Sequence, residues 1–300
     1  APEKVIPFTV RREDLRPILA KFVDGVWLKC ADFQPDILLK RARLYHLPMW
    51  LVDSTVQGEW KAEMGYNYQV KSSQEAYSGG GWQTTEQLEN RLRWEPRLGQ
   101  INLHYDNTIT PAMSDHEQWT GRVGRFAPDS AQTYAPGHLS GVILRVPDLD
   151  TDEAWPLAQD AIKRRLSMDC MRASRAGQLQ RFTADLSYSL LNWSQLLLPV
   201  YATWYTDDEG KRHPIHINGQ SGNVGGVRMA SQRQGWKWAG ITAGIGLGIF
   251  LLALIFFAAA VVIPPLGVVA PVLLVLAALT LMVAIVPAVW PWQWNRSQRR

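Results

Sequence analysis

WAGITAGIGLGIFLLALIFFAAAVV, residues 238–262, is the first of two long uncharged runs near the C-terminus, and VVAPVLLVLAALTLMVAIVPAVW, residues 268–290, is the second. Neither run contains Asp, Glu, Lys or Arg, and each exceeds the roughly 20 residues that a helix needs to cross a bilayer. The linker IPPLG, residues 263–267, combines two helix-breaking prolines with a glycine. The sequence therefore predicts two transmembrane helices joined by a turn.

Aromatic and basic residues flank both runs at the ends that such a hairpin brings to one face of the membrane. Trp favours the membrane interface, and basic residues favour its cytoplasmic side. The turn carries no charge, so we expect both ends of the hairpin to be cytoplasmic, with residues 291–300 as a basic cytoplasmic tail. The predicted membrane-interface residues are Trp236, Lys237, Trp238, Trp290, Trp292, Trp294, Arg296, Arg299 and Arg300.

Gly240, Gly244 and Gly248 repeat every four residues in the first run, a pattern that permits close approach of two helix backbones. We expect this face to pack on the second helix of the same hairpin, with a contact between molecules as the alternative. No ionisable residue lies inside either run, which argues against a proton relay, an ion path or a transporter. The helices are therefore predicted to anchor the chain.

The formal net charge of +4 belongs mostly to the tail. Without Arg296, Arg299 and Arg300, 28 basic residues face 27 acidic residues. Binding to nucleic acid needs a clustered basic surface, so this near-neutral balance disfavours it. The two cysteines, Cys30 and Cys170, are predicted to be reduced thiols rather than a disulfide.

Before the hairpin, the sequence predicts an α+β domain of two β-rich lobes with flanking helices. The predicted lobes cover 1–110 and 151–231, and a loop-rich connection covers 111–150. Periodic apolar residues predict helices, and alternation predicts strands. The expected helices are 11–23, 36–44 and 151–173; the expected strands are 48–52, 59–63, 66–70, 91–94, 99–105, 182–188, 195–205 and 214–218, with turns at 57–58, 78–81 and 207–210.

No pattern in the chain identifies a cofactor, a metal or a catalytic site. His213 and His216 share a predicted strand, where their spacing directs them to opposite faces and away from a common metal. An enzyme acting on lipids or peptides near the bilayer would use Asp53, His104 or Asp106, provided that a pocket brings them together. No cofactor is expected within this chain.

Basic residues cluster on and just beyond the helix predicted over 151–173. A solvated helix face explains them, and the functional alternative is a docking face for anionic lipid headgroups or an acidic partner. The residues of this predicted basic face are Lys163, Arg164, Arg165, Arg172 and Arg175.

Short motifs resemble a family of bacterial two-pass membrane proteins. Residues 218–226, NGQSGNVGG, resemble the strand and turn that lead into the C-terminal spans of that family, and residues 48–53 and 105–112 resemble other family segments. Members usually begin with a four-cysteine zinc ribbon and are often labelled helicase-like or transcription-factor-like for that reason. This chain shows no ribbon and resembles the family from just after it, so either the ribbon is lost or it lies upstream of residue 1. We expect the second, with any zinc upstream of residue 1.

Some members of that family are encoded with flotillin-like (SPFH-domain) proteins and with phage-shock-type membrane-stress proteins. The resemblance therefore implies a bacterial plasma (inner) membrane protein that docks such an assembly, itself part of a homo- or hetero-oligomer. We expect a membrane-anchored scaffold or adaptor on the cytoplasmic face rather than an enzyme. A membrane-tethered enzyme is the first alternative, and a nucleic-acid-associated protein is the second.

Overall fold

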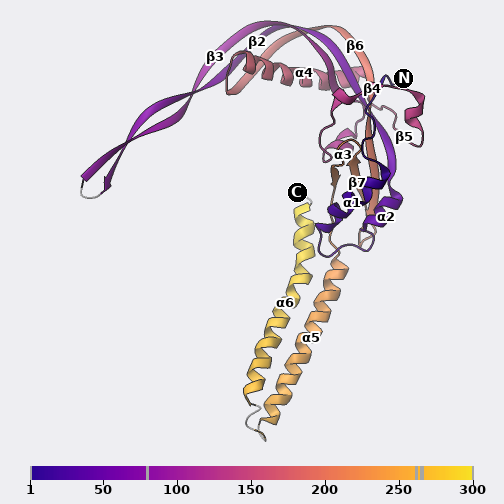
Figure 1. The fold of residues 1–300 in the computed structure, drawn as a ribbon, viewed down its shortest axis with the longest axis vertical. Helices are drawn as coiled ribbons and strands as arrows, with labels where there is room; N and C mark the ends of the chain where they lie inside the picture. The colour runs from indigo at the N-terminus through magenta and orange to yellow at the C-terminus, as the bar shows by residue number, and fades with distance from the viewer. Residues whose placement is uncertain (1, 79–80, 261–262, 264–266, 299–300) are drawn as a thin grey trace. The chain divides into compact units, whose positions relative to one another are not determined.

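The computed structural model describes residues 2–78, 81–260, 263 and 267–298 (Figure 1). It confirms the predicted α+β class: a mixed sheet with flanking helices is followed by two apolar helices at the C-terminus. The chain forms two compact units. Unit 1 comprises Ala1–Val5, Pro48–Ser114 and Val146–Leu197, and unit 2 comprises Ile6–Leu47, Asp115–Arg145 and Leu198–Arg300.

The units interleave along the chain, whereas the predicted lobes, 1–110 and 151–231, were consecutive. The difference arises from two long strands, β2 (Arg43–Ser78) and β6 (Gln178–Thr206), each of which runs through a boundary between the units. The remaining short elements are β1 (Lys4–Val5), α3 (His116–Thr120), η2 (Pro128–Ser130), β4 (Gln132–Thr133), η3 (Pro136–Leu139) and β5 (Ile143–Leu144).

Unit 1 contains an antiparallel ribbon of β2 and β3 (Gly81–Pro111), paired from Met49↔Pro111 to Ser78↔Gly81. The predicted turn at 57–58 is wrong, because Gly58 lies inside β2 and pairs with Ile101. A Cβ atom at Gly58 would collide with the carbonyl oxygen of Asp185 in β6, so the glycine permits close strand approach. The separately predicted strands merge into the continuous strands β2 and β3, and residues 79–80 of the predicted tip lie outside the described residues.

Helix α4 (Thr151–Ala173) covers one face of this ribbon and matches its predicted bounds. Asp150 accepts a hydrogen bond from the Glu153 amide at 2.8 Å, and the Glu153 carboxylate accepts one from the Asp150 amide at 3.2 Å. This reciprocal cap starts the helix. The buried stripe is Ala154, Ala158, Ile162, Leu166 and Cys170, and Trp155 beside it is only half-buried.

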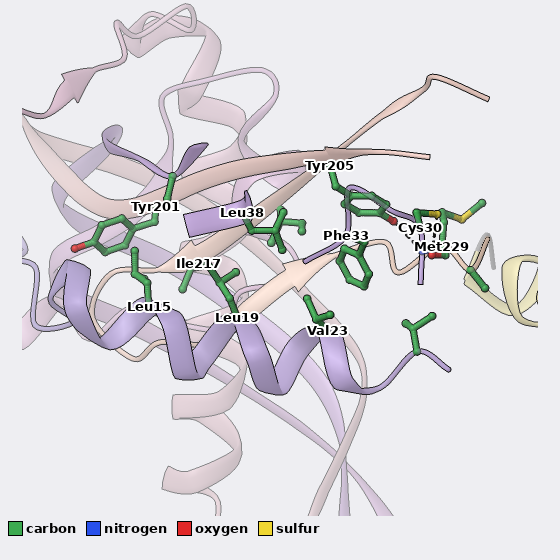
Figure 2. Close-up of a cluster of buried hydrophobic side chains, with 14 residues drawn as sticks. Leu15, Leu19, Val23, Cys30, Phe33, Leu38, Tyr201, Tyr205, Ile217 and Met229 are labelled. Carbon is green, nitrogen blue, oxygen red and sulfur yellow. Dashed lines mark hydrogen bonds between the residues drawn. The ribbon is translucent and has the colours of Figure 1, made fainter. Parts of the chain in front are cut away.

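Unit 2 has its own core between α1 (Leu15–Asp24), which follows η1 (Arg12–Asp14), and the hairpin of β6 and β7 (Arg212–Asn218). Figure 2 shows Leu15, Leu19 and Val23 along one side of α1, directed toward the strands. Helix α2 (Pro35–Arg41) ends before the predicted residue 44, because β2 begins at Arg43. Strand β8 (Val224–Gly226) completes the hairpin edge.

Helices α5 (Gln232–Ala259) and α6 (Val269–Gln298) end the chain and pack on each other (Figure 1). Both are long and apolar enough to cross a membrane, and only 11% and 17% of their most apolar windows are buried. That exposure differs from a core helix of a soluble protein, whose apolar faces are covered. Most of the predicted turn, 263–267, lies outside the described residues.

The contact between α5 and α6 uses small residues at seven-residue spacing, Ala239, Gly246 and Ala253 on α5 with Ala270, Ala277 and Ala284 on α6. The prediction that Gly240, Gly244 and Gly248 face α6 is therefore wrong, because nothing lies within 4 Å of a Cβ atom at any of the three. Gly235 and Gly246 take that role instead. A Cβ atom at Gly235 would collide with the Pro287 carbonyl oxygen, and one at Gly246 would lie 3.0 Å from the Leu281 side chain.

Helix α6 also continues through residues 291–298, which were predicted as a tail. Pro287 and Pro291 do not end it, since both are buried against α5, where Gly235 leaves room. The last turns are held by hydrogen bonds to residues 228–230, described below.

Candidate membrane-interface site

The beginning of α5 is fixed by a carboxylate from the turn between β6 and β7. The buried Ser231 hydroxyl donates to both Asp208 carboxylate oxygens, at 3.0 and 2.8 Å, and accepts from the Gln234 amide at 3.0 Å. Asp208 also accepts a hydrogen bond from the Arg233 amide at 2.9 Å. A serine cap and a carboxylate both satisfy free amides at a helix N-terminus, so this contact joins α5 to the sheet of unit 2.

The end of α6 is bound to the segment that precedes α5. The Asn295 side chain accepts from the Ala230 amide at 2.7 Å and donates to the Ala230 carbonyl at 3.0 Å. The Trp294 indole N–H donates to the Arg228 carbonyl at 2.6 Å. Asn295 is only 9% exposed, and a buried amide that makes both bonds is satisfied.

Tryptophans surround this junction. Trp290 stacks on Trp294 with ring centroids 5.3 Å apart, and Trp27 meets Trp290 edge to face at 5.5 Å. Trp236, Trp238 and Trp292 are more than half exposed. Of the predicted interface residues, Trp290, Trp292 and Trp294 lie together near the end of α6, Trp236, Lys237 and Trp238 lie in the first turns of α5, and Arg299 and Arg300 lie outside the described residues.

A cavity of about 630 Å³ lies at the same junction. Its walls carry charges of both signs, from acidic residues of the β6–β7 turn and from arginines at the start of α5 and the end of α6. Arg296 lies over the Trp292 ring at 5.6 Å, which orients it. The lining residues are Asp207, Asp208, Glu209, Met229, Ala230, Gln232, Arg233, Trp292, Asn295 and Arg296.

Asp207 supports the turn that forms one wall. Its carboxylate accepts hydrogen bonds from the Glu209 and Lys211 amides, at 3.0 and 2.9 Å, and contacts His213 Nε2 at 2.7 Å. Burial alone would raise the pKa of Asp207, but the bonds from His213 and the two amides outweigh it and lower the pKa below the usual value. Asp207 is therefore a structural carboxylate that stays ionised.

His213 and His216 have separate partners, as their predicted strand spacing indicates. His213 binds Asp207, whereas His216 stacks on Trp119 with centroids 4.6 Å apart and lines a second cavity of about 240 Å³. Burial lowers the pKa of His216. Among the described residues, no group of three His, Cys, Asp or Glu side chains could hold a metal ion.

The predicted basic face on α4 is exposed, but part of it is used within unit 1. Arg165 lies over the Tyr105 ring at 4.9 Å and donates to the Asp106 carbonyl at 3.3 Å. Arg172 pairs with Asp169 at 3.0 Å. Lys163, Arg164 and Arg175 point to solvent. A docking role for this face remains a prediction.

The residues of the enzyme alternative lie near one irregularity of the ribbon, where the register shifts between Val52 and Ser54. His104 Nε2 lies 3.0 Å from the Asp106 carboxylate, and the Asp53 carboxylate accepts from the Asn107 amide at 2.7 Å. Both members of the His104–Asp106 pair are exposed, and the two cavities described above are lined by other residues. The groups are close together on a surface, without a shared pocket among those described.

Comparison with known proteins adds one likeness. The chain is 22% identical over 257 residues to the uncharacterized protein YdjG of Bacillus subtilis (strain 168), covering 85% of this chain and 72% of that protein. No protein-family model matches the chain, and no solved structure matches it.

Sequence reasoning missed four residues of this junction: Trp27, Asp207, Asp208 and Asn295. The turn at 207–210 was predicted, but nothing in its sequence indicates that Asp208 would contact Ser231, the N-cap of α5. Asn295 was the one available signal, because an amide near the end of an apolar helix needs a partner. Nothing local in the sequence identifies Ala230 as that partner.

Proposed function

We propose that this protein is a membrane-anchored scaffold or adaptor that docks a partner protein assembly on the cytoplasmic face of a bacterial plasma membrane. The resemblance noted in the sequence favours a flotillin-like or membrane-stress assembly as the partner. The single observation that carries the docking role is an uncovered two-stranded arm in unit 1.

The arm consists of residues 67–78 of β2 and 81–92 of β3. Strand β6 begins at Gln178, beside Gly65, so the ribbon has a third strand only as far as that point. In the described part of the chain no helix covers the arm, and Figure 1 shows both strands extending beyond the end of α4. Where its side chains are described, at residues 67–73 and 86–92, the arm is exposed or half-exposed, and none of these residues is buried.

An isolated two-stranded ribbon is at best marginally stable in water. The arm carries apolar side chains that no core receives, such as Leu88, which is 63% exposed, and Tyr68, which is 45% exposed. Its charges pair internally, with Lys71 3.7 Å from Glu86 and Arg91 3.2 Å from Glu89. A long ribbon with free edges and little net charge suits docking by strand addition or by its faces.

The anchor and its orientation complete the proposal. The two apolar helices, with aromatic residues near their outer ends, support a two-pass anchor. The basic residues flanking the spans support cytoplasmic placement of both ends under the positive-inside rule. The likeness to YdjG suggests no particular activity for this chain, because that protein is itself uncharacterized.

The docking proposal is tested by site-specific photo-cross-linking in native membranes. A photoreactive residue replaces Leu88 in the arm, and a matched variant carries it at Leu190, which is 76% exposed on β6 outside the arm. We expect a protein adduct from position 88 and none of the same mass from position 190. Equal adducts from both positions, or none from position 88, would contradict docking through the arm.

A membrane-tethered enzyme is the second candidate, because His104 is exposed and has a partner at each ring nitrogen. Asp106 lies at Nε2, and the Thr55 hydroxyl lies 2.9 Å from Nδ1. Such an arrangement resembles an oriented base. Loss of a defined hydrolytic activity in His104→Gln, with the fold retained, would support this candidate over the first.

A further inference from the structure

The charge pattern of the 630 Å³ cavity points to a ligand. Arg233 enters it from the first turn of α5, and Arg296 enters it from the last turns of α6. Neither guanidinium group forms an ion pair among the described residues. Glu209 lies beside Asp208 on the other wall of the cavity and is exposed. Its carboxylate forms no hydrogen bond among the described residues.

Two unpaired arginines from separate helices form a suitable site for a phosphate group, since guanidinium donors match phosphate oxygens in geometry and charge. Two carboxylates on the opposite wall match a primary ammonium group. The lining carries three carboxylates, Asp207, Asp208 and Glu209, against two arginines, whereas a site for a purely anionic group would carry excess positive charge.

The walls are fixed in place. Asp208 is held by Ser231 and by the Arg233 amide, and Asn295 is held by two bonds to Ala230. Trp292, more than half exposed, lines the cavity under Arg296. Tryptophan at the end of an apolar helix is typical of the headgroup level of a bilayer. The volume lies within the range of small-molecule sites.

We propose that this cavity binds the zwitterionic headgroup of a membrane phospholipid, with the phosphate between Arg233 and Arg296 and a primary ammonium beside Glu209 and Asp208. Phosphatidylethanolamine has this chemistry. The site rests on α5 and α6 crossing the membrane, and it is independent of docking by the arm. Bound lipid would join the turn of unit 2 to both helices.

The test is native mass spectrometry of the full chain in mild detergent, titrated separately with phosphatidylethanolamine, phosphatidylglycerol and soluble phosphoethanolamine. We expect the wild type to retain phosphatidylethanolamine most tightly. Removal of both arginines, in Arg233→Gln/Arg296→Gln, should weaken that binding about tenfold or more, because each lost contact involves a charged group. Lys40→Gln, exposed on α2 and outside the cavity lining, is the control and should bind as the wild type.

Glu209→Gln separates the two halves of the headgroup and changes only an exposed turn residue, so it keeps the test decisive if the double variant does not fold. It should weaken phosphatidylethanolamine and leave phosphatidylglycerol unchanged. Equal or tighter binding of phosphatidylglycerol by the wild type, or unchanged binding by either variant, would overturn the proposal. Phosphoethanolamine binding as tightly as the lipid would assign the cavity to a soluble ligand instead. Failure of the anchor itself would appear differently, as recovery of the chain without detergent.

Discussion

Asp207 and Asp208 are adjacent, but their carboxylates bind different partners. Asp208 caps α5 through Ser231 and the Arg233 amide, whereas Asp207 closes its own turn and holds His213. The turn between β6 and β7 thus links the sheet of unit 2 to the start of the first apolar helix. At the residue scale, the attachment of the anchor depends on a few satisfied polar groups.

Asp207→Asn should destabilise the protein at pH 7 by about 1–3 kcal/mol, because it weakens a buried, charge-assisted bond to His213. The folded pKa of Asp207 is lowered, so its stabilisation is present above the unfolded pKa, near 3.9, and is lost as pH falls through the folded pKa. Thermal unfolding in detergent from pH 7 to pH 3 should show a shallower acid decline in the variant. Asp129→Asn, at an exposed position, is the control, and identical pH profiles for all three proteins would refute this role.

The two cysteines should be unreactive in the folded protein. Both are free and buried, and burial is the main cause that raises the pKa of Cys30 to about 12 and that of Cys170 to about 11. Since the thiolate is the reactive form, modification by a thiol reagent at pH 8 should be slower than in the unfolded chain by about two orders of magnitude or more. Ser73→Cys, exposed on the arm, should react at once. Rapid labelling of the wild type would show that the thiols are accessible.

At the scale of elements, α5 packs on α6 through Gly235 and Gly246 and not through the predicted glycines, Gly240, Gly244 and Gly248. Gly235→Val should destabilise the helix pair by about 1–3 kcal/mol, because its side chain would collide with the Pro287 backbone. Gly240→Val is the matched control on the open face, where nothing lies within 4 Å. Thermal unfolding followed by tryptophan fluorescence checks both. A larger loss in Gly240→Val would restore the original assignment of the packing face.

The helices were predictable from sequence because their signals are local. The acidic cap and the apolar stripe of α4 gave its bounds, and the length of the uncharged runs gave α5 and α6. The predicted strands all lie within β2, β3, β6 or β7. Their continuity was not predictable, because Gly58, Pro96 and Gly99 are typical breaks in a strand and yet lie at paired positions of β2 and β3. The continuity of the strands depends on pairing between residues far apart in the chain, and a local sequence pattern does not show such pairing.

At the scale of the whole molecule, neither the interleaving of the two units nor the polar contacts that hold the junction together could be predicted. The bond between Asn295 and Ala230, and the cap of α5 by Asp208, join residues far apart in sequence. What the sequence did predict was the pair of apolar helices, since each uncharged run is continuous and its flanking aromatic and basic residues lie next to it in the chain. The docking role remains a proposal, based on the arm and on resemblance.

The predicted orientation of the anchor can be checked by cysteine accessibility, since the native thiols are buried. Ile263→Cys should react with a membrane-impermeant maleimide in intact cells once the outer layers are made permeable. Ser297→Cys should react only after the plasma membrane is opened, because both ends are expected in the cytoplasm. The reverse labelling would invert the topology, and labelling of both sites in intact cells would argue against two complete spans.

The measurement that tests docking most directly is co-purification from native membranes in mild detergent, comparing the full chain with a variant whose arm is removed. In this variant an Asn-Gly turn joins Tyr66 to Arg93. These two residues are paired across the ribbon, twelve pairs before the last pair, Ser78 and Gly81. We predict that both proteins enter the membrane and that only the full chain retains a protein assembly. The same assembly on both proteins, or the full chain recovered alone, would contradict a docking function of the arm.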